Sequence, residues 1–208
     1  MLGGTFNPPH LGHLAVARHA LLELALDRVL LVPAHTAPYK AGEDGVWDGR
    51  DPGPQHRLRM CRLAVDGVAG LSVSAVEVER GGLSYTVDTL TSIHASHADA
   101  ELTFIVGADT AQTLPTWREP ARVLELARLA VAARAGAERR RVLAALSGLG
   151  VAAADVSFLA MPAIDVSSSL VRRRAADGES IDELVGPAVA AYIAEHRLYR
   201  AGAEAVLR

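Results

Sequence analysis

Short apolar runs alternate with segments of helical periodicity along the whole chain, and this alternation constrains the fold of its 208 residues more than any other feature. Buried strands of parallel sheets are short and almost entirely apolar, whereas helices repeat apolar residues every three to four positions. The predicted strands are 29–34, 71–80, 102–109, 127–134 and 156–162. The predicted helices are 11–26, 55–68, 85–96, 120–126, 138–146, 168–176 and 186–195. This order predicts an α/β fold, a doubly wound parallel sheet with helices on both faces.

The composition narrows the class of protein. The alternation continues to the last helix, so we expect one domain spanning residues 1–208. Half of the residues are hydrophobic and the formal net charge is −3, which gives no basic field for nucleic acid. The sequence has no membrane-spanning run or N-terminal signal segment and a single cysteine, Cys61, so we expect a cytoplasmic protein without an internal disulfide. Cys61 is interpreted as a buried hydrophobe, and a homo-oligomer is left open.

Four unusual segments follow predicted strands. They are GGTFNPPHLGH (3–13), PAHTAPYK (33–40), GADTAQTLPTW (107–117) and IDVSSSLVRR (164–173). In doubly wound sheets the ligand lies beyond the carboxyl ends of the strands. The shared location therefore predicts that these segments surround one ligand site.

His10 and His13 are three residues apart where a loop becomes a helix, so both rings can face one way. The N–H groups at a helix N-terminus favour phosphate, and two imidazoles add donors there. Gly12 would let a ligand approach the backbone, and Gly3 and Gly4 would allow a sharp turn. The alternatives are two surface histidines or a zinc pair, although no third ligand lies at a typical metal spacing.

Serines and arginines share the last of these segments. Ser167 or Ser168 is predicted to cap the following helix, and the same hydroxyls would suit a phosphate. Arg172 lies one turn into that helix, where its guanidinium would reach the same anion or simply face solvent. For Arg173 and Arg174 we favour a solvated basic face.

These segments together carry a family resemblance. GGTFNPPHLGH contains the H-x-G-H signature of the nucleotidylyltransferase superfamily, and VSSSLVR resembles its second signature, I-S-S-T-x-I-R. PAHTAPYK, SYTVDTL, FIVGADTAQTLPTW and VAAYIAEHRLYR occur in the same order in bacterial nicotinate-nucleotide adenylyltransferases. The resemblance covers nearly the whole chain, and SYT with GAD…PTW distinguishes this family within the superfamily.

The resemblance implies a Rossmann-like fold and the transfer of the adenylyl group of ATP to nicotinate mononucleotide, with Mg²⁺ required. The ion could bind protein groups or only the triphosphate, and we favour the triphosphate because Mg²⁺ commonly binds substrate phosphates. The implied catalytic residues are His10, His13, Lys40 and Arg172. The implied ATP-binding residues are Gly4, Thr5, Phe6, His10, Gly12, His13, Gly107, Asp109, Ser167, Ser168 and Arg172. The implied nicotinate-binding residues are Thr86, Trp117 and Arg118.

The residues themselves agree with this chemistry. The nucleophile would be the substrate's own phosphate, and the sequence shows no Ser-His-Asp order or activated cysteine. Catalysis would then be positioning and stabilisation of phosphoryl charge. Trp117 follows a proline past a strand end, where its ring could stack on a pyridine, although a core role is the alternative.

Three features depart from the family pattern. Tyr39 stands where the family usually has a histidine before Lys40, and Ser169 stands where threonine is usual. Only Met1 and Leu2 precede the first paired glycine, where the family has a longer apolar strand. Because that strand is central in the implied fold, we expect the true start of the protein to lie upstream.

Alternative functions remain. Within the superfamily, the chain could act on nicotinamide mononucleotide or be a different nucleotidylyltransferase. A nucleotide-binding regulatory protein without catalysis is a second class, which the presence of both histidines, Lys40 and Arg172 disfavours. A class I aminoacyl-tRNA synthetase shares a histidine-glycine signature, but this chain leaves little room for domains that read tRNA.

Overall fold

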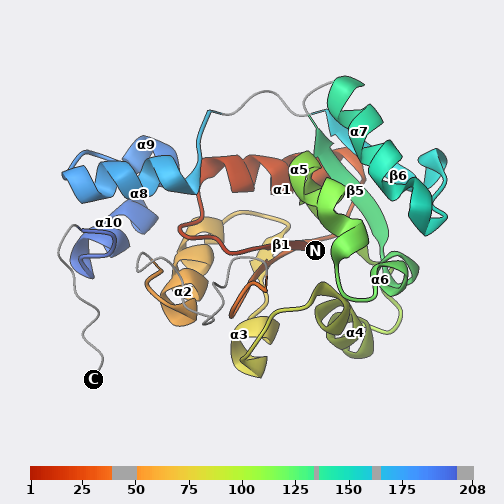
Figure 1. Cartoon of the computed structure of the whole chain (residues 1–208). Coiled ribbons are helices and arrows are strands. Elements are labelled where there is room, and N and C mark those ends of the chain that lie inside the picture. Colours follow the sequence, from red (N-terminus) through yellow and green to blue (C-terminus); the bar gives the residue numbers. More distant parts are fainter. Residues whose placement is uncertain (39–50, 134–135, 161–164, 201–208) are drawn as a thin grey trace.

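Six parallel strands form the sheet at the centre of the computed structural model, which describes residues 1–38, 51–133, 136–160 and 165–200 (Figure 1). The strands are β1 (Leu2–Gly4), β2 (Val29–Pro33), β3 (Leu71–Val73), β4 (Thr103–Gly107), β5 (Arg128–Ala133) and β6 (Val156–Ala160). Their spatial order is β3-β2-β1-β4-β5-β6, which is the order of Rossmann-type sheets. The predicted doubly wound parallel sheet is therefore confirmed.

The chain reverses its direction of travel through the sheet between β1 and β4. β1 pairs with β2 through Leu2–Leu31 and Gly4–Pro33, and with β4 through Leu2–Ile105. The connections that follow the two strands run to opposite faces of such a sheet, and the loops that begin them leave a crevice between them. The fold therefore places any nucleotide site after Gly4 and Gly107, at the carboxyl ends of β1 and β4.

Helices cover both faces of the sheet because the strand residues alternate between two apolar clusters. Leu31 and Ile105 face α1 (Leu11–Glu23) and α2 (Pro54–Val65) on one side. Val32 and Val106 belong to the cluster on the other side, which includes the following helices: α4 (Thr86–Ser96), α5 (Ala108–Thr113), α6 (Pro120–Leu126) and α7 (Gly136–Leu146). Among the described residues, no helix is long and apolar enough to cross a membrane.

A third apolar cluster joins the last three helices to the outer side of α2. These helices are α8 (Ser168–Asp177), α9 (Asp182–Val185) and α10 (Pro187–Glu195), grouped at one end of the molecule in Figure 1. Met60 of α2 packs among their apolar residues, whereas its neighbour Cys61 faces the sheet. Cys61 is fully buried, as predicted, and burial raises the pKa of its thiol far above the usual value. The position of α2 thus links the C-terminal helices to the sheet.

The segment 71–80 is not one strand, so that prediction is wrong. The strand β3 ends at Val73, and residues Val76–Arg80 form the short helix α3. Ser74 donates its backbone N–H to Leu31 as the last contact with β2, and its side chain then accepts from the N–H of Val76 at 3.4 Å. The alternating valines of this segment fit a strand, but they also place Val78 in the core when they are wound as a helix. The sequence pattern also missed α9 and three short 3-10 turns: η1 (Leu114–Thr116), η2 (Ser147–Leu149) and η3 (Ala153–Asp155).

Candidate active site

A buried turn connects β1 to α1 and contains the first signature. Thr5, Phe6 and Asn7 are all buried, and Phe6 has a left-handed backbone with φ 50°. The sharp turn therefore falls at Phe6, and the expectation that Gly3 and Gly4 make it is wrong, since both glycines lie in the extended strand. A Cβ on Gly4 would come within 3.4 Å of the Phe6 ring. The absence of a side chain at Gly4 thus lets that ring fold back over the strand end.

His10 and His13 lie side by side at the start of α1, with ring centroids 3.7 Å apart and 31° between the ring planes. His10 is the N-cap residue, and its backbone N–H donates to Nδ1 of His13 at 3.2 Å. Because Nδ1 of His13 accepts a hydrogen bond, the proton of the neutral ring is on Nε2. Phe6 packs edge-on against the His13 ring at 4.9 Å. The two rings face the same way, as their spacing predicts.

His10 is nearly buried, with 9% of its surface exposed. Burial lowers the pKa of His10 from 6.5 to about 4, because desolvation disfavours the charged imidazolium. The ring is therefore neutral at neutral pH. The histidine pair offers hydrogen-bonding groups to a ligand without adding a fixed positive charge at His10.

The second signature meets the first at this turn. Ser167 is the N-cap residue of α8 and accepts from the N–H of Leu170, which confirms the predicted cap. Ser168 Oγ donates to the carbonyl of Pro8 at 2.9 Å, and an Arg172 terminal nitrogen donates to the carbonyl of Asn7 at 2.7 Å. Segments about 160 residues apart in sequence are thus brought together, as the strand-end argument requires.

Unsatisfied polar atoms are concentrated at this turn. Across the described residues, three buried side-chain nitrogen or oxygen atoms have no hydrogen-bond partner, and two of them are His10 Nδ1 and Arg172 Nε. Arg172 also donates to Ser169 Oγ at 3.2 Å, so the serine that replaces the usual threonine keeps a hydroxyl contact. Buried polar groups without partners are rare in folded proteins and often mark functional sites. Both atoms belong to residues that the sequence assigns to phosphate binding.

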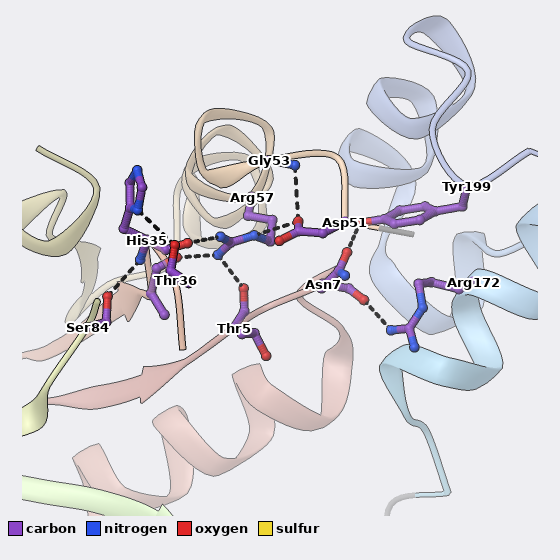
Figure 2. A network of polar contacts seen from close by, with 11 residues as sticks. Thr5, Asn7, His35, Thr36, Asp51, Gly53, Arg57, Ser84, Arg172 and Tyr199 are labelled. Atoms are coloured by element: carbon purple, nitrogen blue, oxygen red, sulfur yellow. Dashed lines mark hydrogen bonds and ion pairs between the residues drawn. The ribbon is translucent and has the colours of Figure 1, made fainter. Parts of the chain in front are cut away.

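Arg57 ties the ends of β1 and β2 together from α2, as Figure 2 shows. Its guanidinium is fully buried and donates to the carbonyls of Thr5 at 2.9 Å, His35 at 2.7 Å and Ala34. Its Nε donates to Asp51 Oδ1 at 2.9 Å, and that oxygen also accepts the N–H of Gly53. A buried cation is tolerated when it is paired and hydrogen-bonded in this way. Arg57 therefore fixes the path of the backbone just before the signature turn.

Sequence reasoning missed Arg57, Asn7 and Tyr199. The sequence did contain a signal for Arg57. It lies three positions before Met60 and four before Cys61, which places it on the apolar side of the predicted helix. A charged residue on such a face needs buried partners. Asn7 and Tyr199 gave no comparable signal, because their contact joins the two ends of the chain.

A cavity of about 440 Å³ lies beside the ends of β2 and β4, and it brings together the residues predicted to hold the nicotinate. Thr86, Trp117 and Arg118 all line it, as does Asp109, which the family resemblance places at the nucleotide. The Trp117 indole donates to Thr113 Oγ1 at 3.0 Å and packs against the buried core, so this ring has a core contact and lines the cavity as well. The volume of the cavity suits a small ligand.

Arg118 and the N-terminus of α4 lie at this cavity. Arg118 stacks over the ring of Tyr85 at 4.9 Å, and its guanidinium lies 3.5 Å from Asp88 and 3.6 Å from Glu119. Thr86 begins α4, whose N-cap residue Tyr85 makes no side-chain cap bond. Free N–H groups at a helix N-terminus attract anions. The cavity therefore suits a ligand that carries both an aromatic ring and a carboxylate.

The remaining predicted residues have simpler surroundings. Gly107 is exposed at the end of β4, where a Cβ would meet no atom within 4 Å, and Gly12 is buried in the first turn of α1. Lys40 and Tyr39 lie outside the described residues. Arg174 pairs with Glu183 and Glu179 rather than with the signature turn, in keeping with its predicted surface role.

Comparisons with known proteins point to one family. A family model described as cytidylyltransferase-like matches residues 1–174. A protein of Gemmatimonas aurantiaca is 42% identical over 202 residues, which cover 96% of this chain and 91% of that protein. One of Thermomicrobium roseum is 44% identical over 202 residues, covering 96% of this chain and 90% of that protein. Both carry the name "Probable nicotinate-nucleotide adenylyltransferase".

Solved structures show the same fold. The nicotinic acid mononucleotide adenylyltransferase of Plasmodium falciparum, complexed with NaAD, matches with a TM-score of 0.73 and covers 95% of both chains. The same enzyme complexed with APC gives a TM-score of 0.70 over 95% of this chain and 94% of that one. The sequence identities are 16% and 15%, so these two comparisons speak for the fold alone.

Arg57→Met should lower the free energy of unfolding by about 3–5 kcal/mol, because Asp51 and three carbonyls lose a buried donor. Arg59→Met is the matched control, since Arg59 is exposed on the same helix and its loss should change the free energy by less than about 0.5 kcal/mol. Urea unfolding of the two variants measures both values. Equal effects of the two substitutions would show that Arg57 does not hold the strand ends.

Acidification should destabilise the protein in part through His10. The unfolded chain protonates this residue near pH 6.5 and the folded chain only near pH 4, so the unfolded state binds more protons between these values. The free energy of unfolding should therefore fall as pH drops from about 7 to about 5, and His10→Asn should lose roughly 2 kcal/mol less than the wild type. His94→Asn, which changes an exposed histidine, is the control and should follow the wild type. An identical pH dependence for all three proteins would contradict the burial of a neutral His10.

Proposed function

The chain belongs to the nicotinate-nucleotide adenylyltransferases of the cytidylyltransferase-like family, and on this premise we propose that it transfers the adenylyl group of ATP to nicotinate mononucleotide. The products would be nicotinate adenine dinucleotide and pyrophosphate, as a step of NAD biosynthesis. The observation that carries the proposal is that two candidate sites follow the neighbouring strands β1 and β4. A turn rich in phosphate-binding groups lies after β1, and a cavity suited to an aromatic carboxylate lies beside β4.

The triphosphate of ATP would lie against the start of α1. The His13 Nε2–H and the guanidinium of Arg172 would donate to phosphate oxygens, together with N–H groups at the helix N-terminus. Ser167 and Ser168 lie at the start of α8 beside the same turn. The backbone of Gly4, Thr5 and Phe6, with Gly107 and Asp109 across the crevice, would line the nucleotide.

The reaction needs no protein nucleophile. A phosphate oxygen of nicotinate mononucleotide attacks the α-phosphorus of ATP, and the bond from that phosphorus to the bridging oxygen breaks. Pyrophosphate leaves with the electron pair of the broken bond. The attacking phosphate oxygen is already ionised at neutral pH, so no proton has to be removed from it. The protein then acts by aligning the two substrates and by stabilising the charge on the phosphoryl oxygens.

Mg²⁺ would enter this site with ATP. Across the described ranges, no group of three or more His, Cys, Asp or Glu side chains could hold a metal ion, and the groups at the signature turn are nitrogen donors and hydroxyls. This donor set suits phosphate oxygens and does not suit a hard cation, which prefers oxygen ligands. Bound to the triphosphate, the ion would neutralise phosphate charge, while His13 and Arg172 orient the same group.

The pyridine ring of the second substrate would stack on Trp117 in the cavity. Its carboxylate would lie near Arg118 and the N–H groups that begin α4 at Thr86. Asp88 and Glu119 flank Arg118 and offset part of its charge, so the helix N-terminus shares the recognition of the carboxylate. The uncharged carboxamide of nicotinamide mononucleotide would bind Arg118 and the N-terminus of α4 more weakly than a carboxylate does.

His13→Ala should lower kcat about 100- to 1000-fold, with a much smaller change in the KM for ATP, because the donor acts on charge that develops in the transition state. Pyrophosphate release in the steady state measures both constants. His19→Ala is the matched control, since His19 lies on the same helix and pairs with Glu23 at its partly exposed surface. Near-normal turnover of His13→Ala would contradict the assignment.

The direct test of the proposed function compares two acceptors. With ATP, kcat/KM for nicotinate mononucleotide should exceed that for nicotinamide mononucleotide by roughly 10- to 100-fold, since hydrogen bonds to a charged group are worth about 1.5–3 kcal/mol. Arg118→Gln should reduce this ratio, whereas Arg122→Gln, which breaks the exposed pair with Glu125 on α6, should leave it unchanged. Equal efficiency with both acceptors would refute the substrate assignment, and no pyrophosphate release with either would refute adenylyl transfer.

A further inference from the structure

The C-terminal segment reaches the signature turn from outside both signatures. After α10 ends at Glu195, the chain turns back so that Leu198 and Tyr199 pack on the apolar cluster of the last three helices. The Tyr199 hydroxyl donates to Asn7 Oδ1 at 2.7 Å, a contact between residues 192 positions apart (Figure 2). A residue near the end of the chain thus contacts the turn that begins it.

Asn7 is the point where this contact meets the proposed phosphate site. Its side chain accepts from Tyr199 while its backbone carbonyl accepts from the Arg172 guanidinium at 2.7 Å. Asn7 is buried, with 3% of its surface exposed, so it cannot turn toward water without exposing or unpairing these groups. Fixing the Asn7 side chain therefore also fixes the carbonyl that orients Arg172.

The backbone around Tyr199 is held in an uncommon conformation. Tyr199 has φ 65° and Arg197 has φ 53°, both in the left-handed region that residues other than glycine rarely adopt. The Leu198 N–H donates to the carbonyl of Ile193, which anchors the turn to α10. Such conformations persist where the surrounding structure requires them, and they are concentrated at functional positions.

The hydroxyl of Tyr199 is a dependable donor. Burial raises the pKa of Tyr199 well above its usual value, and the Asp51 carboxylate acts in the same direction. The phenol therefore keeps its proton at neutral pH. Asp51 also binds Arg57, so the contacts of Tyr199 and Arg57 are adjacent in Figure 2.

We propose that Tyr199 is a positioning residue for adenylyl transfer: its hydroxyl holds Asn7, and Asn7 in turn holds the Arg172 guanidinium toward the triphosphate. The inference rests on the proposed function. It assigns to the C-terminal segment a role in the geometry of the phosphate site, although Tyr199 itself touches no substrate. Because Arg172 stabilises charge that grows in the transition state, a displaced Arg172 lowers kcat more than it raises KM.

Tyr199→Phe removes the hydroxyl and keeps the ring, so the apolar packing of Tyr199 is preserved. We expect kcat to fall about five- to tenfold, the loss that corresponds to one hydrogen bond, while the KM for ATP changes less than about twofold. Tyr192→Phe is the matched control. It removes the hydroxyl that binds His56 Nδ1 at 2.9 Å on the neighbouring helices, and it should leave kcat unchanged.

A double-mutant cycle separates positioning from a general structural effect. If Tyr199 acts through Asn7, adding Tyr199→Phe to Asn7→Ala should cause no further loss of kcat. Unchanged kcat in Tyr199→Phe, or losses that multiply in the double variant, would overturn the inference. The wild-type protein is assayed in the same series, so absence of adenylyl transfer there would refute the proposed function separately from the role of Tyr199.

Discussion

The buried guanidinium of Arg57 is the interaction on which the geometry of the crevice depends. It joins the carbonyl after β1, at Thr5, to two carbonyls after β2, at Ala34 and His35. Each of these strand ends leads into a different part of the site. Thr5 opens the signature turn, whereas the N–H of His35 donates to Oγ of Ser84, which itself lines the cavity. One side chain therefore fixes the spacing between the proposed phosphate and pyridine sites.

In the part of the phosphate site that the structure describes, the permanent cation of Arg172 stands beside a neutral His10. Arg172 carries a fixed charge, but burial keeps His10 neutral at neutral pH. An anion bound nearby would favour protonation of His10 and raise its pKa. A neutral His10 thus spares the ligand-free protein a second buried positive charge at the turn that Arg172 contacts. The chain's net charge of −3 gives no overall basic field, so an anionic ligand depends on local groups such as these.

Much of the site was predictable because its side chains follow directly from strand ends. The alternation of strands and helices placed the histidines and the 164–173 segment at one edge, where Arg172 and Ser168 indeed meet the turn at Asn7 and Pro8. The network behind them was not predictable, since Arg57 binds main-chain carbonyls that every sequence provides. The left-handed conformation of Phe6 is equally invisible in the sequence, where the neighbouring glycines suggested the turn instead. The prediction of one strand over 71–80 was wrong for another reason, because the valines of this segment can be buried in a helix as well as in a strand.

The turn between β1 and α1, together with α8, should hold the triphosphate. A crystal structure of the protein with a non-hydrolysable ATP analogue and nicotinate mononucleotide tests it most directly. We expect phosphate oxygens within hydrogen-bonding distance of His13 Nε2 and the Arg172 guanidinium, with the pyridine ring in the cavity beside Trp117. A triphosphate bound away from both His13 and Arg172 would show that this turn is not the phosphate site.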